Sequence, residues 1–373
     1  MLNKSLVLRV LGGWTLLFVV GGCASAPTKE SDVFENITQL TSGYTAAGEA
    51  YFSPDMRWIV YQATPAGEGG YQMYVARLLR FEGVVTGIGQ PIRVSPQGSI
   101  NTCGYFSPDG VSLIFASTAG KPVEEKQPGG YQRDSGRYRW AFHKGMDVFR
   151  ADAWQGAIAA AEFSAGIDLA QHRITDNDAY DAECAYSPNG RHIVFTSTRD
   201  ADPAKPVKES RDADLYVMRA DGSNVVRLTT ADGYDGGAFF SPDGRSLVYR
   251  SDRKNDNLLQ LFVADVARDA AGNVTGLVNE KQITSDPAVH FGPFWHPDGQ
   301  HLVYAASTEN HSNYEVFQIR RDGTKKLRLT FTAGADLLPA FSPDGRYMMW
   351  TSKRSADRTS QIWIAKYKKP AAG

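Results

Sequence analysis

The stretch FFSPDGRSLVYRSD, residues 239–252, joins a turn signal to a run of strand-forming residues. Within SPDG, proline presets φ for the second turn position, aspartate caps the turn, and glycine takes the positive φ that a tight hairpin end needs. The SLVYRS that follows has the composition of a strand. We therefore interpret the motif as a structural turn, because no partner group that catalysis would require recurs beside it.

Near-copies of this stretch occur five more times, so the element is a repeat. The intervals between successive prolines are 54, 80, 54, 55 and 46 residues, a period typical of propeller blades or solenoid units. The six turn prolines are Pro54, Pro108, Pro188, Pro242, Pro297 and Pro343. An aromatic residue precedes each proline by two positions, where we expect a core anchor: Phe52, Phe106, Tyr186, Phe240, Trp295 and Phe341.

Each repeat unit contains enough strand signals for a four-stranded sheet. The turn strand is followed by a second strand, such as DLYVMRAD at 214–221, and by a third that ends in a Leu-Thr signature, such as VVRLTT at 225–230. The segment that runs into the turn supplies the fourth strand. The sequence therefore predicts an all-β fold, a six-bladed β-propeller of four-stranded blades, over residues 34–369.

The ends of the repeat region predict how the ring closes. The sixth unit stops after QIWIAKY (361–367), one strand short, and the missing type of strand occurs before the first turn as NITQLTS (36–42). We expect this N-terminal strand to complete the last blade, which would join the two ends of the ring and remove exposed sheet edges.

The N-terminus reads as an export signal. Basic residues precede a short apolar run that stops at VGGC (20–23), which favours a lipoprotein signal peptide over residues 1–22, with Cys23 as the lipidated residue. Residues 23–33 then form a polar, flexible tether. Because Ala24 follows the cysteine, the sorting rule of enteric bacteria predicts a lipid anchor in the outer membrane, facing the periplasm. An ordinary signal peptide that happens to contain a cysteine is the alternative.

The charge balance argues against a nucleic-acid partner, and the few cysteines argue against a fold held together by disulfides. The chain has 40 basic and 41 acidic residues and a formal charge of −1, without the basic stripe that a nucleic-acid surface needs. Two further cysteines, Cys103 and Cys184, fall at neighbouring positions of successive repeats, so a bridge between them is conceivable. We expect two buried, unpaired thiols.

The FSPDG turns, the strand DLYVMRADGSNVVRLT (214–229) and the Leu-Thr ends resemble the TolB-type propeller repeat of bacterial envelope proteins. The resemblance covers about residues 34–369 and is specific for the fold, whereas such propellers serve both as binding platforms and as accessory domains of enzymes. Two features depart from TolB itself. TolB carries an α/β domain before its propeller, for which this chain has no room. TolB is also soluble in the periplasm, whereas we expect this chain to be lipid-anchored.

Topology places one polar set near the mouth of the central channel, on the face opposite the proline turns. Seven residues before the prolines, at the starts of the innermost strands, stand Ala47 and five polar residues, Asn101, Asp181, Asp235, His290 and Asp336. Two positions later, Glu49 and Glu183 add carboxylates. This set could hold a divalent cation or a cationic ligand group, or it could consist of solvated or backbone-capping side chains.

An insertion in the second unit falls on the same face. Residues 118–146 account for the 80-residue interval, and their second half mixes basic and aromatic residues such as Arg137 and Trp140. Such a loop could be a lid or a partner-binding arm, or a packed decoration at the blade edge.

Two functions remain open. The first is an envelope lipoprotein whose propeller binds a protein or glycan partner at the channel mouth without catalysis and without a cofactor. Its support is the absence of hydrolase, zinc-protease, phosphate-loop and CxxC motifs. The alternative is a metal-dependent propeller enzyme such as an oligogalacturonate-type polysaccharide lyase, for which only His290, with His143 and His311, would reach the channel face.

Overall fold

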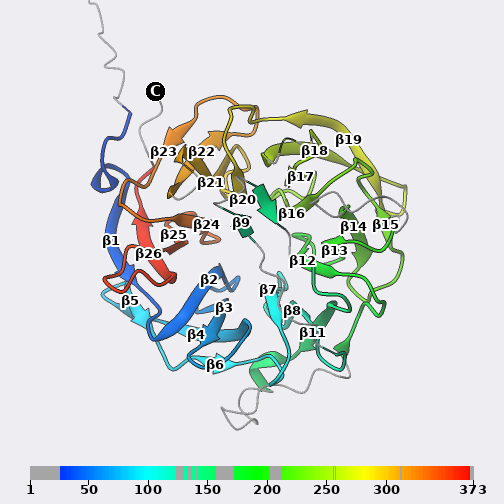
Figure 1. The fold of residues 1–373 in the computed structure, drawn as a ribbon, viewed down its shortest axis with the longest axis horizontal. Helices are drawn as coiled ribbons and strands as arrows, with labels where there is room; N and C mark the ends of the chain where they lie inside the picture. The colour runs from blue at the N-terminus through cyan, green and yellow to red at the C-terminus, as the bar shows by residue number, and fades with distance from the viewer. Residues whose placement is uncertain are drawn as a thin grey trace, which may run out of the picture.

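The computed structural model describes residues 26–122, 130–132, 137–139, 142–156, 172–201, 212–254, 256, 258–310 and 313–369. Six sheets stand as blades around one axis, which confirms the all-β, six-bladed propeller (Figure 1). The proposed signal peptide and Cys23 lie outside the described residues, as does part of the 118–146 insertion. Within the described ranges, no helix is both long and apolar enough to cross a bilayer.

Strands occupy equivalent places in every blade. The innermost strands are β2 (Tyr44–Phe52), β7 (Asn101–Phe106), β12 (Asp181–Tyr186), β16 (Asp235–Phe240), β20 (His290–Trp295) and β24 (Asp336–Phe341). The second strands are β3 (Trp58–Pro65), β8 (Ser112–Ser117), β13 (His192–Ser197), β17 (Ser246–Ser251), β21 (His301–Asn310) and β25 (Tyr347–Ser352). The third strands are β4 (Gln72–Phe81), β11 (Asp147–Asp152), β14 (Asp214–Arg219), β18 (Gln260–Arg268), β22 (Asn313–Arg320) and β26 (Gln361–Tyr367).

The outer strands vary most between blades. They are β6 (Ile92–Arg93), β15 (Val226–Arg227), β19 (Val274–Gln282), β23 (Leu327–Arg328) and β1 (Phe34–Gln39). In blade two, a bridge between Phe149 and Arg173 is what the described residues show in this place. Blade one adds β5 (Val84–Ile88) beside β4, and the insertion of blade two contains the short hairpin of β9 (Gly130–Gln132) and β10 (Arg137–Arg139).

The proline turns are structural, as the sequence predicts. In blade four, Ser241 Oγ donates to Asp243 Oδ1 at 2.6 Å, the same carboxylate oxygen accepts the backbone N–H of Arg245, and Ser246 N donates to Ser241 Oγ. The pattern recurs in blades one, two, three and six, with asparagine replacing aspartate in blade three. The aromatic residue two positions before each proline is at most 8% exposed, which confirms these residues as core anchors.

The Leu-Thr signature also has a repeated physical role. In blade three, Thr229 Oγ1 accepts the backbone N–H of Leu215 at 2.9 Å and donates to Asp214, so one hydroxyl fastens the outer segment to the third strand. A serine or threonine accepts the equivalent N–H in each of the other blades: Ser95, Thr175, Thr284, Thr330 and Thr41.

The N-terminal strand closes the ring, as predicted. β1 pairs antiparallel with β26, from Phe34 opposite Tyr367 to Gln39 opposite Trp363, and completes the sheet β1-β26-β25-β24. The fold begins before residue 34, however. The 3-10 helix η1 (Glu30–Asp32) lies inside the segment that the sequence assigned to a tether, and its Glu30 carboxylate forms an ion pair with Arg354 of blade six at 2.9 Å.

Candidate functional site

The residues at the starts of the innermost strands are buried. Three of them are aspartates paired with an arginine that follows the second strand of the same blade. Asp181, for example, accepts hydrogen bonds from Ser197 and Arg199 at 2.5 and 2.7 Å. The pairs are Asp181–Arg199, Asp235–Arg253 and Asp336–Arg354, and each aspartate is at most 1% exposed.

The two remaining polar residues of this set are also fully buried. The amide of Asn101 donates to Ser99 and to Gln72, and His290 lies between the carbonyl oxygen of Leu259 and a carboxylate oxygen of Asp286, which is 2.9 Å from its Nε2. The expectation that these five side chains open toward the channel mouth is therefore corrected. The three aspartates pair inside their own blades, whereas Asn101 and His290 bond to groups of the preceding blade, and the structure does not bring the five together.

A different position faces the centre of the ring. Every innermost strand has a β-bulge five residues before its proline, where the pairing register shifts and the backbone adopts φ between 50° and 60°. The bulge residues are Glu49, Cys103, Glu183, Gly237, Gly292 and Leu338. Four of them are not glycine, so the backbone there carries strain of the kind that often accompanies functional positions. Bulges also re-aim side chains next to binding sites.

Glu183 is the most heavily bonded of these residues. Its carboxylate accepts hydrogen bonds from Tyr234 Oη at 2.5 Å and from the backbone N–H of Gly237 at 2.6 Å, and it forms an ion pair with Arg250 at 3.3 Å. Arg250 in turn donates to Tyr234 Oη and lies 4.1 Å from the ring centre of Phe291. This network ties blade three to blade four near the axis.

Two consecutive glycines make room for that network. A Cβ on Gly236 would lie 2.1 Å from Tyr234 Oη and 2.6 Å from a Glu183 oxygen, and a Cβ on Gly237 would lie 2.8 Å from the guanidinium carbon of Arg250. The repeat motifs did not predict a role for Arg250 or Tyr234. One sequence signal could have found Arg250, because it interrupts the otherwise apolar alternation of the second strand in blade four. Tyr234 has no comparable signal.

Glu49 has a different environment on the blade-one side. Burial raises its pKa to about 7, a hydrogen bond from Cys103 opposes that shift, and the negative charge of Glu183 adds to it. Tyr51 Oη lies 3.4 Å from the carboxyl group as a hydrogen-bond donor. The nearby thiols of Cys103 and Cys184 are free and buried, which confirms the unpaired state. We call Glu49, Cys103, Glu183, Tyr234 and Arg250 the central cluster.

Below the central cluster, four aromatic rings close the axis. Tyr51 contacts Tyr105, Phe239 and Phe294 with ring centroids 5.1, 5.5 and 5.7 Å apart, so side chains from blades one, two, four and five meet. We call these four residues the aromatic plug. Between the plug and the ring of proline turns lies a cavity of about 300 Å³ lined by aromatic and proline side chains. The central cluster therefore lies on the opposite side of the plug, toward the face where the innermost strands begin, which we call the loop face.

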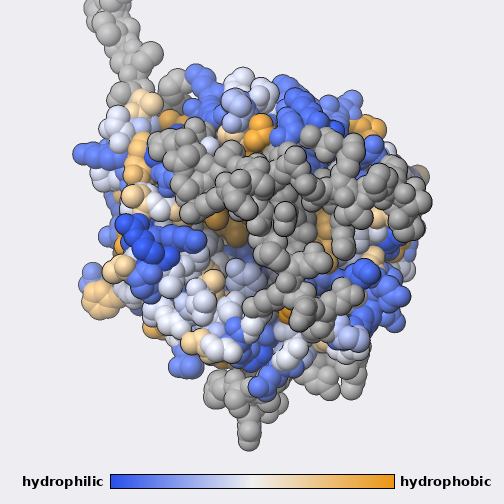
Figure 2. Space-filling view, viewed as in Figure 1, coloured by the Kyte–Doolittle hydropathy of each residue, from blue (hydrophilic) through white to orange (hydrophobic). Residues whose placement is uncertain are grey.

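The blade-two insertion reaches the loop face. Its strand β9 lies near the middle of the ring in the view of Figure 1. Near the end of the insertion, Phe142 packs against Tyr180 and Tyr234, with ring centroids 4.9 and 6.4 Å apart. The rim of the same face carries many hydrophilic side chains (Figure 2). The insertion thus contacts Tyr234, a member of the central cluster.

The described histidines and acidic residues do not form a metal site. Among the residues that the structure describes, no group of three or more His, Cys, Asp and Glu side chains is arranged to hold an ion. His290 is engaged by the Leu259 carbonyl oxygen and by Asp286, burial lowers the pKa of His143, and His311 lies outside the described ranges.

Comparisons with known proteins agree with the fold. No family model matches the chain. A TolB homologue of Chlorobium luteolum is 29% identical over 168 residues, which are 44% of this chain and 32% of that protein. The matched stretch thus spans about a third of the curated relative.

Solved structures extend the likeness to nearly the whole chain. A putative TolB from Agrobacterium tumefaciens superposes with a TM-score of 0.53 at 16% identity, covering 89% of this chain and 97% of that one. A gluconolactonase from Xanthomonas campestris reaches 0.54 at 15% identity, covering 92% and 94%. At these identities the structural likeness shows the fold alone. Together with the sequence match, it shows that the chain is a β-propeller protein similar to TolB.

Proposed function

We propose that the chain is a cell-envelope protein whose propeller is a non-catalytic platform that binds a protein or glycan partner at the centre of its loop face. The observation that carries the proposal is the position of the central cluster. The aromatic plug blocks the axis on the side of the proline turns, so a ligand that contacts Glu49 or Glu183 has to arrive from the loop face. Strained bulge residues of different types occupy that place in the ring.

The bonding of Glu183 favours recognition over catalysis. Both of its oxygens are engaged, by Arg250 on one side and by Tyr234 and Gly237 on the other, which leaves little capacity for accepting a proton from a substrate. Glu49, with a pKa of about 7, can instead donate or accept a hydrogen bond near neutral pH. Aromatic side chains near the cluster, such as Tyr71 and Phe142, would add apolar contact area.

Anchoring of this platform in the outer membrane through a lipid on Cys23 is the second part of the proposal. It rests on the lipobox-like sequence VGGC (20–23) and on the polar residues that follow. The change Cys23→Ser should move the protein from the membrane fraction to the soluble periplasmic fraction. Unchanged membrane association of that variant would contradict the anchor and would leave the binding proposal standing.

Site-specific photo-crosslinking in intact cells tests the binding site. A photoreactive residue at Tyr71, which is 37% exposed next to the first residue of the third strand, should capture a discrete partner. The matched control is Phe81, which is 69% exposed at the other end of the same strand. Equal labelling from the two positions would contradict a site on the loop face.

A glycan array with purified protein distinguishes the two partner classes. Capture of a defined protein at position 71 supports a protein partner, whereas glycan retention that weakens in Glu49→Gln supports a glycan. If neither a crosslink nor a retained glycan depends on these positions, the platform proposal fails.

A further inference from the structure

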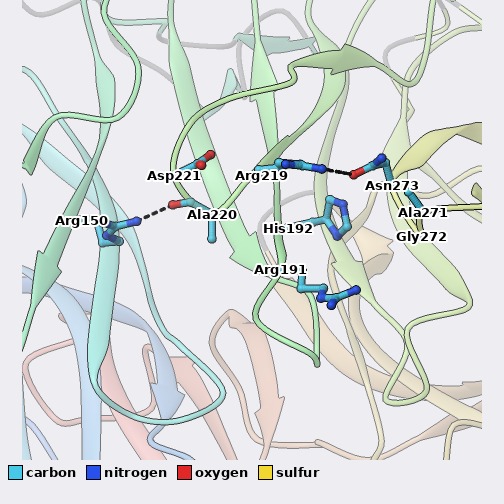
Figure 3. A pocket seen from close by; sticks show the side chains of 9 residues that line it. All are labelled: Arg150, Arg191, His192, Arg219, Ala220, Asp221, Ala271, Gly272 and Asn273. Carbon is cyan, nitrogen blue, oxygen red and sulfur yellow. Dashed lines mark hydrogen bonds between the residues drawn. The ribbon is translucent and has the colours of Figure 1, made fainter. Parts of the chain in front are cut away.

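A second site lies away from the loop face, between blades two, three and four. A pocket of about 450 Å³ opens beside the proline turn of blade three (Figure 3). Its lining comes from β11, from the turn and second strand of blade three, and from two outer hairpins: Arg150, Arg191, His192, Arg219, Ala220, Asp221, Ala271, Gly272 and Asn273. A volume of this size is typical of small-molecule sites.

His192 has no partner in this pocket. The residue is 3% exposed, and neither ring nitrogen makes a hydrogen bond with any residue that the structure describes. At the equivalent position of other blades the polar group is satisfied: Ser112 donates to Asp152, Ser246 donates to Asp265, and His301 contacts Asp298. A buried polar group without a partner is costly, so the exception at His192 points to a ligand.

The positive charge around the pocket indicates what kind of ligand it can bind. Opposite His192 in the strand pair stands Arg219, whereas blades two and four place Asp152 and Asp265 there. Within the described part of the chain, the guanidinium of Arg219 donates only to the neutral side chain of Asn273, at 2.7 Å (Figure 3). Arg191 is exposed, and its guanidinium has no hydrogen bond or ion pair with any residue that the structure describes.

Only part of this positive charge is compensated. Arg150 pairs with Asp152 at 2.9 Å and donates to the carbonyl oxygen of Ala220. Asp221 is the one acidic residue among the lining side chains, and it accepts from Ser223. Two arginines therefore keep free N–H groups beside an unsatisfied imidazole, an arrangement suited to a multivalent oxyanion.

We propose that this pocket binds a small ligand that carries a phosphate or sulfate group, with Arg191, Arg219 and His192 donating to its oxygens. The volume exceeds that of a free oxyanion, so the group would be attached to a body about the size of a sugar. The proposal concerns a face other than the loop face and does not depend on the platform function.

The ionisation of His192 supplies a separate readout. Burial lowers its pKa, and the positive charges of Arg268, Arg219 and Arg191 lower it further, while Asp269 opposes them. A bound anion would offset the arginines and raise the pKa, so binding should take up a proton. Affinity for a sulfate ester, which does not titrate in this range, should therefore fall as the pH rises from 5.5 to 8.

Titration calorimetry with four probes tests the proposal: glucose 6-phosphate, glucose 6-sulfate, glucuronate and glucose. We expect saturable binding of the phosphate and the sulfate, weaker binding of glucuronate, and no binding of glucose. Arg191→Gln and Arg219→Gln should each weaken the binding of glucose 6-sulfate by about tenfold or more, because each removes a charged hydrogen bond. Glucuronate binding as tightly as the sulfate would overturn the assignment to a tetrahedral oxyanion.

The matched control is Arg245→Gln, since Arg245 holds the same turn position in blade four, where Asp265 lies opposite Ser246. This variant should bind as the parent does. Absence of saturable binding by either charged ester, or an equal loss in Arg191→Gln and Arg245→Gln, would overturn the proposal. Because Arg191 and Arg245 are exposed turn residues, both variants should keep the parent melting temperature.

Discussion

Arg250 of blade four and Glu183 of blade three form an ion pair across a blade boundary, 3.3 Å apart, with side chains only 7% and 11% exposed. Tyr234 donates to the carboxylate and accepts from the guanidinium, so three residues share one network beside the axis. The same network holds a bulge of the next blade, because Glu183 also accepts the backbone N–H of Gly237. Polar groups that would be costly alone are satisfied here by residues of neighbouring blades.

Replacing only one partner of the Arg250–Glu183 pair should lower the free energy of unfolding. Arg250→Met leaves the Glu183 carboxylate buried without its charge partner, and we expect a loss of about 3 kcal/mol in the free energy of unfolding. Urea denaturation measures it. The double variant Arg250→Met, Glu183→Gln should lose less than the sum of the two single changes, because the residues are in contact. Additive losses would show that the pair is not coupled.

Glu49 should make stability depend on pH. Its folded pKa of about 7 lies above the ordinary value of 4.5, so between these values the folded protein binds more protons than the unfolded chain. The contribution of Glu49 to stability therefore decreases as the pH rises from 4.5 to 7. Glu49→Gln should match the parent melting temperature at pH 5 and exceed it at pH 8, on the order of 3 °C.

The control for this effect is Glu82→Gln. Glu82 shares the positive φ of Glu49, at 48°, but is an exposed residue of the turn between β4 and β5. Its replacement should shift the melting curves at both pH values alike. A Glu49→Gln variant whose difference from the parent does not change with pH would refute the assignment.

If the N-terminal strand closes the ring as the other outer strands close their blades, two distant threonines should contribute equally to the free energy of unfolding. Thr41, before the first blade, and Thr284, within blade four, each accept a backbone N–H of a third strand at 2.9 Å and are at most 6% exposed. Thr41→Val and Thr284→Val should therefore each lower the free energy of unfolding by about 1–3 kcal/mol. A near-zero effect of Thr41→Val would mean that the N-terminal strand is only loosely attached. Deletion of residues 34–42 should destabilise the whole ring.

The glycine pair beside the central cluster gives a packing test. Gly236→Ala would place a Cβ 2.1 Å from Tyr234 Oη, and we expect a loss of about 3 kcal/mol or more, since overpacking forces the network apart. Gly276→Ala is the control, because its Cβ would meet no atom within 4 Å. That change should stay within about 0.5 kcal/mol. Comparable unfolding curves for the two variants would contradict the described packing.

The fold could be predicted from the sequence because its determinants are local and repeated. The turn chemistry of SPDG, the aromatic residue before each proline and the threonine of the Leu-Thr ends each keep one role in nearly every blade. Because the sixth unit lacks one strand and residues 36–42 have the pattern of that strand, the sequence predicted which segment completes the blade. These residues form part of β1 and the segment after it. Sheet edges that must be paired leave few ways to close such a ring.

The candidate site required the tertiary structure, because a count along the chain assumes regular strands. The bulge five residues before each proline inserts one residue, and a shift of one residue reverses which face of a strand its side chains occupy. The three aspartates seven positions before their prolines, Asp181 among them, consequently pair inside their own blades, while Glu49 and Glu183 belong to the central cluster. The bulges themselves depend on neighbouring blades, since Glu49 N donates to Thr351 and Gly237 N donates to Glu183. Only the assembled ring supplies those acceptors.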